Sequence, residues 1–322
     1  MNDPQTIIGR LAPSPTGAQH LGNARTYLIA WLMARSQQGT LFLRMEDIDS
    51  PRVKPWAAQQ AIDDLKWLGL DWDGEVLVQT ERFCLYHQAL EELKKQELVY
   101  PCTCTRSEVL QAASAPHEDG REPVYPGTCS HRQAADANNI QGKPFCWRFR
   151  LPPKEPDFHD GFHGFIPGRY REQSGDFVIW RMGDTAGQSV PAYQLAVVVD
   201  DAAQGINQVV RGDDLIPSTP RQLLLYKSLG LAAPGYFHVP LVVGEDGRRL
   251  AKRHGDTRIS TLREQGVSAE KILGLLAWSC GWLPNIEPIT ARELLSFFDL
   301  KTIPRQPFVL GKEHFQSIGY TC

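Results

Sequence analysis

The first 39 residues of the chain constrain its fold more than any other segment. Residues 6–11 are apolar and predict a strand, and from Asn23 to Gly39 apolar residues recur at helical spacing. The loop between them, at 12–22, contains two prolines and two glycines, which prevent either element from continuing through it. A strand that leads through a tight loop into a helix begins an α/β unit, so we expect a parallel, nucleotide-binding sheet.

Later segments continue this alternation, with one interruption. Between residues 73 and 189 the sequence is rich in proline, glycine and cysteine, with short extended pieces, which indicates an inserted domain. Helices and strands resume at 193, so the sheet should be completed after the insertion. The expected elements are a strand at 40–45, helices at 56–68 and 83–93, an extended piece at 145–151, a strand at 209–211, and helices at 220–229, 268–278 and 291–298, the last opened by a Thr290–Glu293 capping box.

Composition excludes several classes of protein. With 322 residues, 42% of them hydrophobic, the chain can bury a sizeable core, which rules out a disordered chain and a disulfide miniprotein. The net charge of −3 means that any nucleic-acid binding must be local. The cysteines number seven, and an odd count fits reduced thiols better than a disulfide framework. The N-terminus has no basic or apolar leader, and the longest apolar run, of 8 residues, is too short to cross a membrane. We therefore expect a cytoplasmic protein with no membrane partner.

The loop at 12–23 places a histidine and a glycine directly before a helix N-terminus. Backbone N–H groups and the positive end of the helix dipole attract anions, so this position suits a phosphate. His20 can donate a hydrogen bond to a phosphoryl oxygen, and Gly22 would let a nucleotide approach the backbone closely. A structural loop that carries a surface histidine is an equally simple interpretation, because a His-x-Gly sequence is common by chance.

A second candidate site is the basic loop at 247–255, which has four cations within six positions. In isolation such a run is typical of a solvated basic face. Beside a phosphate-binding loop, however, it becomes a candidate for neutralising phosphate charge, with Lys252 as its central residue.

The first of these loops belongs to one of four sequence blocks that follow one another along the chain. Together with the late Leu250-x-Lys252 they resemble the HIGH and KMSKS signatures of class I aminoacyl-tRNA synthetases, and specifically the glutamyl branch of that class. Two departures from the pattern are Asn23, where the first signature normally ends in histidine, and Ala251, where the second normally has serine; the second also lacks its usual first lysine. The blocks are RLAPSPTGAQHLG at 10–22, RMEDID at 44–49, YQLAVVVDD at 193–201 and VRGDD at 210–214.

This resemblance implies a fold and a domain plan. The fold would be α/β, a Rossmann-like parallel sheet with an inserted zinc-containing domain and a small C-terminal helical domain. The residues after Arg253 leave little room for an anticodon-binding domain, so none is expected. The expected parts are the two halves of the catalytic domain at 1–72 and 190–243, the insertion at 73–189, and a KMSKS-like loop with a helical domain like a stem-contact domain at 244–322.

The resemblance also implies a glutamate site. Free glutamate carries an ammonium and two carboxylates, so its recognition needs both signs of charge. Arg10 and Arg211 are candidates for the carboxylates and Glu46 for the ammonium, although each could instead form an ordinary ion pair. The family's sites map onto Arg10, Leu11, Ala12, Pro13, Ser14, Glu46, Tyr193 and Arg211 for glutamate, onto His20, Gly22, Asn23, Leu250 and Lys252 for ATP with its Mg²⁺, and onto His20 and Lys252 as catalytic residues.

A cysteine cluster predicts a metal site in the insertion. Cys102-x-Cys104 and Cys129 could supply three thiolates to a tetrahedral zinc ion, which leaves one position open. From chemistry alone the fourth ligand could be His117, His131 or Tyr125. The resemblance favours Tyr125, because the related proteins have a Cys-x-Cys…Tyr-x-x-x-Cys pattern, and the site would be structural.

Length narrows the resemblance to the short glutamyl-Q tRNA(Asp) synthetase family. Membership implies activation of glutamate by ATP without tRNA, followed by transfer to the queuosine at the wobble position of tRNA(Asp). The expected partners are therefore glutamate, ATP and a queuosine-bearing tRNA(Asp), and we expect a monomer. One alternative is a short glutamyl-tRNA synthetase that charges a tRNA 3′ end. Another is a non-catalytic synthetase-like binding protein, for which His20, Lys252 or the glutamate-site residues should have been lost.

Overall fold

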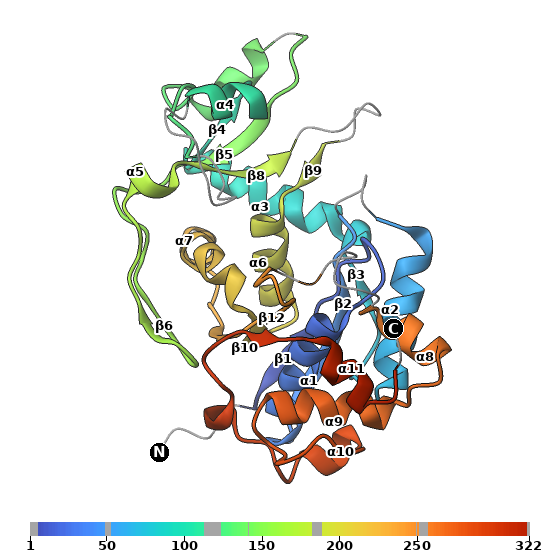
Figure 1. Ribbon diagram of the computed structural model, residues 1–322. Coiled ribbons are helices and arrows are strands. Elements are labelled where there is room, and N and C mark those ends of the chain that lie inside the picture. The colour runs from blue at the N-terminus through green and yellow to red at the C-terminus, as the bar shows by residue number, and fades with distance from the viewer. Residues whose placement is uncertain are drawn as a thin grey trace.

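The computed structural model describes residues 6–48, 53–112, 124–140, 142–181, 189–248, 250 and 257–320 (Figure 1). A parallel α/β body carries an antiparallel insertion at one end and a group of short helices at the other. No helix in these residues is long and apolar enough to cross a membrane.

The expected parallel sheet is present. Strand β1 (Ile8–Leu11) pairs in parallel with β2 (Thr40–Met45), and β2 pairs with β3 (Leu77–Val78). A second parallel pair, β10 (Gln208–Gly212) and β11 (Gly235–Val239), lies beside β1, where the N–H of Asn207 donates to the carbonyl of Ile8 over 3.0 Å. The carboxyl ends of β1, β2 and β10 therefore meet at one edge, where open α/β sheets bind their ligands.

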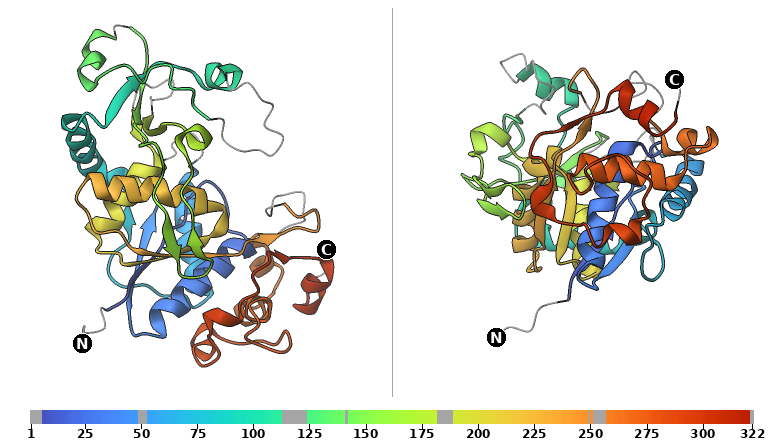
Figure 2. Two further views of the ribbon diagram at one scale, coloured as in Figure 1. Left: turned by 90° about the vertical axis from the view of Figure 1, so that its left-hand side faces the viewer. Right: turned by 60° about the horizontal axis from the view of Figure 1, so that its bottom comes forward.

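Helix α1 (Leu21–Arg35) connects β1 to β2 and is buried on almost every side. A helix that is apolar all round must be covered on all faces, and here the sheet covers one side and the C-terminal helices cover the other (Figure 2). Arg25 joins α1 to α9 (Ala269–Ser279), because its guanidinium donates to the hydroxyl of Ser279 over 3.0 Å and to the carbonyl of Pro240 over 2.8 Å.

A second apolar cluster joins the catalytic body to the insertion. Helix α6 (Tyr193–Ala203) packs there with α3 (Phe83–Lys95) and α7 (Thr219–Ser228), against side chains of the inserted strands. The carboxylate of Asp200 is fully buried in this cluster, where it accepts hydrogen bonds from Arg82 and Tyr86. The helices α2 (Pro55–Trp67), α3 and α7 occur where the apolar spacing predicts them, within one or two residues at each end.

The insertion is built on an antiparallel sheet of order β4-β5-β8-β9. The extended piece expected at 145–151 is its second strand. A separate hairpin of β6 and β7 extends along the body toward β11 (Figure 1), where Gly161 N donates to Tyr236 O over 2.8 Å. The elements are β4 (Val99–Cys102), α4 (Arg106–Ala112), β5 (Cys146–Phe149), β6 (Phe158–Asp160), β7 (Gly164–Ile166), α5 (Arg171–Ser174), β8 (Phe177–Arg181) and β9 (Val190–Pro191).

The C-terminal part contains short helices and one parallel strand pair. The capping box predicted at Thr290 is present, because its hydroxyl accepts from Glu293 N and the Glu293 carboxylate accepts from Thr290 N. The expected helix at 291–298 is shorter than predicted, since residues 295–297 make i→i+3 hydrogen bonds in place of α-helical ones. The elements are β12 (Val242–Val243), α8 (Ile259–Glu264), α9, α10 (Ala291–Leu294), β13 (Phe308–Val309) and α11 (Lys312–Ser317).

Candidate functional site

A cavity of about 500 Å³ lies where β1, β2 and β10 end and α1 begins. Of the eight residues predicted to bind glutamate, six line it. Leu11 does not, because its side chain packs in the core, and neither does Pro13, whose carbonyl instead accepts from Glu46 N over 3.0 Å. The six lining residues are Arg10, Ala12, Ser14, Glu46, Tyr193 and Arg211.

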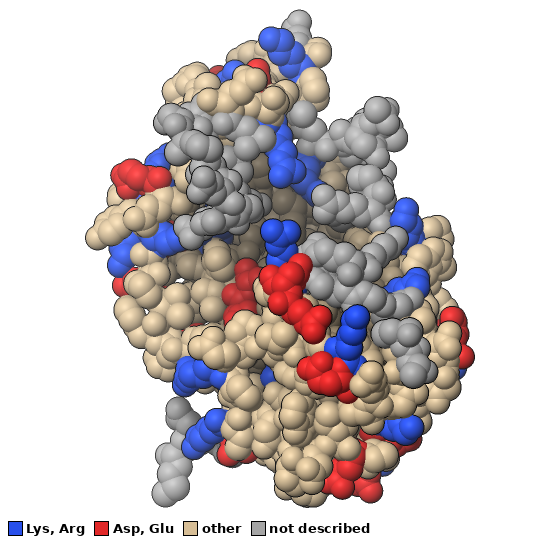
Figure 3. All heavy atoms as spheres, viewed as in Figure 1, with Lys and Arg blue, Asp and Glu red and all other residues tan. Residues whose placement is uncertain are grey.

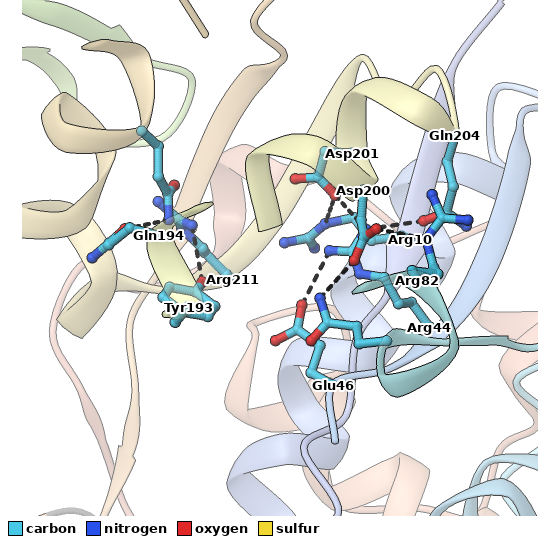
Figure 4. A network of polar contacts seen from close by, with 12 residues as sticks. Arg10, Arg44, Glu46, Arg82, Tyr193, Gln194, Asp200, Asp201, Gln204 and Arg211 are labelled. Carbon is cyan, nitrogen blue, oxygen red and sulfur yellow. Dashed lines mark hydrogen bonds and ion pairs between the residues drawn. The ribbon is translucent and has the colours of Figure 1, made fainter. Parts of the chain in front are cut away.

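A buried ion-pair network holds one wall of the cavity (Figure 4). Arg44 is fully buried and lies between two carboxylates, 2.6 Å from Asp201 and 3.1 Å from Glu46. Arg10 lies 3.4 Å from the same Asp201 and donates to the carbonyl of Val210 over 3.2 Å. Arg44 and Asp201 occur in the matched blocks but were assigned no role; their signal was a charge inside an otherwise apolar strand or helix.

Glu46 contributes a negative charge to the cavity, whose lining also includes Asp214. Burial raises the pKa of its carboxyl, and the positive charges of Arg44 and Arg10 oppose that rise. Because Arg44 already pairs with one of its oxygens, the carboxylate has a fixed position at the cavity wall. A ligand ammonium would complete its coordination.

Arg211 contributes the positive charge on the opposite wall. Its guanidinium donates from Nε to His238 Nε2 over 3.0 Å, from Nη1 to Tyr193 Oη over 3.3 Å and from Nη2 to Thr219 Oγ1 over 2.8 Å. Three of its five N–H donors are thereby used, and one remains on each terminal nitrogen. A carboxylate in the cavity could accept those two donors as a bidentate partner.

His20 caps α1 with its own ring. Its Nδ1 accepts from Gly22 N over 3.1 Å and from Asn23 N over 3.4 Å, while Asn23 Oδ1 accepts from His20 N over 3.2 Å. An accepting Nδ1 means that the neutral ring carries its proton on Nε2. A Cβ on Gly22 would lie 3.0 Å from His20 Cε1, so any larger residue there would press on the ring.

The predicted catalytic residue Lys252 and its neighbour Ala251 lie outside the described residues, but both flanks of their loop are described. Leu250 is buried in the core that contains α1. After the loop, Thr257 O accepts from Leu21 N over 3.0 Å, which fixes the chain directly beside the first turn of α1. The chain therefore leaves the basic loop next to the His20 turn.

A second cavity, of about 880 Å³, adjoins the first and lies between the catalytic body and the insertion. Ser14, Glu46 and Tyr193 line both cavities. Figure 3 shows a hollow between the upper and lower parts of the molecule, with basic and acidic side chains around it. The remaining wall carries arginines, amides and hydroxyls, among them Arg148, Arg221, Gln194 and Ser218.

The three cysteines of the predicted metal site come together in the insertion, with their sulfurs within 4.8 Å of one another. Cys104 Sγ lies 3.7 Å from Cys129 Sγ, and Tyr125 Oη lies 3.3 Å from Cys102 Sγ and 3.8 Å from Cys104 Sγ. No histidine joins the group in the part of the chain that the structure describes; His117 lies outside that part. Side-chain interactions with Cys146 and with Tyr125 lower the pKa of Cys102, and burial opposes that fall.

Comparison with known proteins gives consistent relatives. The family model of the class I tRNA synthetase (E and Q) catalytic domain matches residues 6–310. A glutamyl-Q tRNA(Asp) synthetase of Rhodopirellula baltica is 52% identical over 95% of this chain and 97% of its own length. A glutamate–tRNA ligase of Aquifex aeolicus is 40% identical over 94% of this chain but only 64% of its own length.

The fold also has solved counterparts. The crystal structure of a glutamate tRNA ligase from Elizabethkingia meningosepticum, in complex with its amino acid, superposes with a TM-score of 0.80 at 24% identity. The match covers 98% of this chain and 69% of that one. At this identity the likeness establishes a shared fold, with its parallel sheet and inserted domain.

Proposed function

Because the chain belongs to the glutamyl-Q tRNA(Asp) synthetases within the class I tRNA synthetase family and is therefore an enzyme, we propose that it activates glutamate with ATP, without tRNA, and transfers it to queuosine at the wobble position of tRNA(Asp). The observation that carries the proposal is a single cavity that places Arg10, Glu46 and Arg211 beside the His20 turn of α1. Few ligands other than an amino acid with an acidic side chain need two positively charged partners and a negatively charged one in the same cavity.

In this proposal each charged group of glutamate is bound by a different side chain of the cavity. Arg10 and Arg211 take the two carboxylates, Glu46 takes the ammonium, and Ser14 and Tyr193 supply neutral hydrogen bonds. Glutamine should be a poor substrate, because a neutral amide loses the charge-assisted pair that an arginine makes with a carboxylate.

ATP would lie over the first turn of α1. The positive end of the helix and the backbone around Gly22 and Asn23 suit its phosphates. Leu250, also expected to bind ATP, is buried in the core that contains α1. His20, whose ring orientation is fixed by capping, would donate from Nε2 to a phosphoryl oxygen. Lys252 would neutralise the pyrophosphate, and the Mg²⁺ that accompanies ATP would bridge phosphate oxygens.

The reaction then needs no general base for activation. The ionised α-carboxylate of glutamate attacks the α-phosphorus of ATP, pyrophosphate leaves, and a glutamyl adenylate forms. The protein contributes position and charge stabilisation as negative charge develops on the phosphates. In the second step a ring hydroxyl of queuosine attacks the adenylate carbonyl, and AMP leaves as the ester forms.

The second cavity is the natural place for the acceptor nucleoside. It opens onto the same Ser14, Glu46 and Tyr193 that border the glutamate site, so a nucleoside there would lie beside the activated carbonyl. Its arginines and amides match the hydroxyls and phosphates of an anticodon loop. The body at 1–72 and 190–243, the insertion at 73–189 and the part at 244–322 would then act as one catalytic unit.

For the insertion we infer a structural zinc ion held by Cys102, Cys104, Tyr125 and Cys129. Tetrahedral zinc with Zn–S bonds of about 2.3 Å places its sulfurs about 3.8 Å apart, which agrees with the 3.7 Å between Cys104 and Cys129. The ion would stabilise the insertion. None of its ligands lines the first cavity, but Cys104 and Tyr125 line the second, so the ion would also hold part of that wall in place.

The proposal is tested by locating the attached glutamate. The protein is incubated with labelled glutamate, ATP and queuosine-bearing tRNA(Asp), and the tRNA is digested to nucleosides. We expect the label on queuosine and no label on tRNA(Asp) that lacks queuosine. Periodate treatment of the 3′-terminal ribose alone should not remove the label. Label on the 3′ adenosine would identify a short glutamyl-tRNA synthetase, and no adenylate and no label would identify a binding protein.

A further inference from the structure

A buried chain of hydrogen bonds runs from the β6–β7 hairpin to the candidate glutamate site. Asp160, at the end of β6, lies with Oδ2 2.7 Å from His238 Nδ1 on β11, and His238 Nε2 accepts from Arg211 Nε on β10 over 3.0 Å. Asp160 and His238 have no exposed surface, and Arg211 is only 5% exposed. Neither Asp160 nor His238 lines either of the two cavities described above, and neither belongs to a matched sequence block.

The chemistry of these groups fixes where the protons lie. An arginine side chain can only donate, so His238 Nε2 must accept and the ring proton must be on Nδ1. That proton is donated to Asp160 Oδ2. Asp160 Oδ1 is held in turn by the backbone N–H groups of Phe162, at 2.9 Å, and His163, at 2.8 Å, so the carboxylate cannot rotate.

We infer that Asp160 and His238 are positioning residues that fix the Arg211 guanidinium with one free N–H on each terminal nitrogen directed at the substrate carboxylate. This inference rests on the proposed function, because it takes Arg211 to bind glutamate. The second anchor, Thr219 Oγ1 at 2.8 Å from Nη2, and the ring of Tyr236, 4.9 Å from the guanidinium carbon, limit the remaining freedom of the group.

The hairpin that supplies Asp160 is built to approach β11 closely. A Cβ on Gly161 would lie 2.1 Å from a ring atom of Phe237, so only glycine allows β6 to reach this position. His238 N also donates to Asp160 Oδ2 over 3.2 Å, which ties the carboxylate to both the backbone and the ring of one residue. The insertion thereby contributes an essential support to a site that it does not line.

The arrangement makes glutamate binding sensitive to acid. Protonation of His238 would place an N–H where Arg211 Nε already donates. Burial and the charge of Arg211 lower the pKa of His238 while Asp160 opposes them; His163 and Tyr236 are the other titratable groups that face it. Burial opposes ionisation of Asp160, but hydrogen bonds from His238, His163 and Phe162 lower the pKa of its carboxyl. The chain of hydrogen bonds from Asp160 through His238 to Arg211, which we call the relay, is therefore intact at neutral pH. It is lost only when the pH falls below the range in which histidine ordinarily titrates.

The proton positions can be tested without any substrate. Nitrogen NMR of protein labelled in its histidines, with His238 assigned from the spectrum of His238→Gln, should show His238 neutral with its proton on Nδ1. In Asp160→Asn the two backbone donors keep the amide oxygen, the amide nitrogen faces the ring, and the proton should move to Nε2. A cationic His238 at neutral pH, or a proton on Nε2 in the wild type, would overturn the relay.

The link to substrate is tested by calorimetric titration with glutamate at neutral pH. We expect the Kd for glutamate to rise at least 10-fold in His238→Ala and in Asp160→Asn. In His238→Gln, which keeps a hydrogen-bond acceptor, it should rise less than about 3-fold. The affinity for ATP should stay unchanged in all three variants. The matched control is His159→Ala, an exposed histidine beside Asp160. On lowering the pH, the wild type should lose affinity before His238→Gln does.

Each outcome decides a separate point. Wild-type affinity in a folded His238→Ala protein would show that the relay does not position Arg211. A wild-type protein that binds no glutamate would contradict the proposed function and the role of the relay in it, while the NMR result would still establish the hydrogen-bond geometry. If His238→Ala does not fold, the NMR spectrum and the pH profile of the wild type decide the question.

Discussion

At the scale of single residues, the site depends on side chains whose partners limit their freedom. His20 is fixed by capping α1, and Arg211 is held on three sides. Such preorganisation matters in catalysis, because misplacement by about 1 Å can cost a factor of 10² in rate. Small changes next to these residues should therefore reduce the rate without unfolding the protein.

Gly22→Ala tests this at His20. The added Cβ would lie 3.0 Å from His20 Cε1, so the ring must move by a few tenths of an ångström. We expect the rate of adenylate formation to fall by about 10-fold or more, with ATP KM and the melting temperature nearly unchanged. A raised ATP KM with an unchanged rate would instead mean that Gly22 serves close approach by the nucleotide. Gly235→Ala, where a Cβ has only ordinary contacts, is the control.

Lys252→Ala tests the basic loop. If the ammonium stabilises charge on the transferring phosphates, the rate of adenylate formation should fall by roughly 10²-fold or more, equivalent to about 2.7 kcal/mol, with little change in glutamate affinity. Arg248→Ala should have a much smaller effect, because Arg248 lies outside the signature. A solvated basic face would spread small, salt-sensitive effects over both variants, and single-turnover measurements separate the two results.

At the scale of elements, the sequence predicted regular segments well and local irregularities less well. The strand at 40–45 has the predicted bounds, because an apolar run is bounded there by a glycine and a charged loop. Helix α1 begins at Leu21 and not at Asn23, since histidine is an unusual cap that composition does not reveal. Helix α10 ends early in a tight turn that the apolar spacing could not indicate.

The cysteine-bearing element gives a prediction about metal. The wild-type protein should bind about one equivalent of zinc, Cys102→Ser should lose it, and the insertion should then unfold at a lower temperature. Cys84→Ser, on the exposed side of α3, is the matched control and should retain full zinc content. Retention of zinc by Cys102→Ser would rule out the ligand set, and retention by Tyr125→Phe would indicate His117 as fourth ligand, since the described His131 does not join the group.

At the scale of the whole molecule, the sequence identified the charged residues that line the cavity but not the buried residues that hold them in place. Arg10, Glu46 and Arg211 lie in blocks far apart in the chain, and all three line one cavity. His238 and Asp160 were missed, because 78 residues separate them and neither stands in a motif. A contact between an inserted hairpin and a catalytic strand is a property of the folded chain, which no local pattern encodes.

The complete site predicts the behaviour of the intact protein. Glutamate should support exchange of pyrophosphate into ATP with no tRNA present, because the groups assigned to glutamate and to the phosphates come from this one chain. Glutamine should support exchange at a much lower rate at equal concentration. Exchange that appears only after tRNA is added would favour an ordinary synthetase, and comparable rates for the two amino acids would contradict the assignment of the arginines.

The wall shared by the two cavities has a consequence for nucleic-acid binding. Ser14, Glu46 and Tyr193 face both spaces, so an amino acid bound among them becomes part of the surface that the second cavity presents. A nucleoside entering that cavity meets a complete surface only after the first substrate has bound. For the proposed reaction this geometry makes bound glutamate part of the nucleoside's binding surface, so glutamate should raise the affinity of the protein for the nucleic acid.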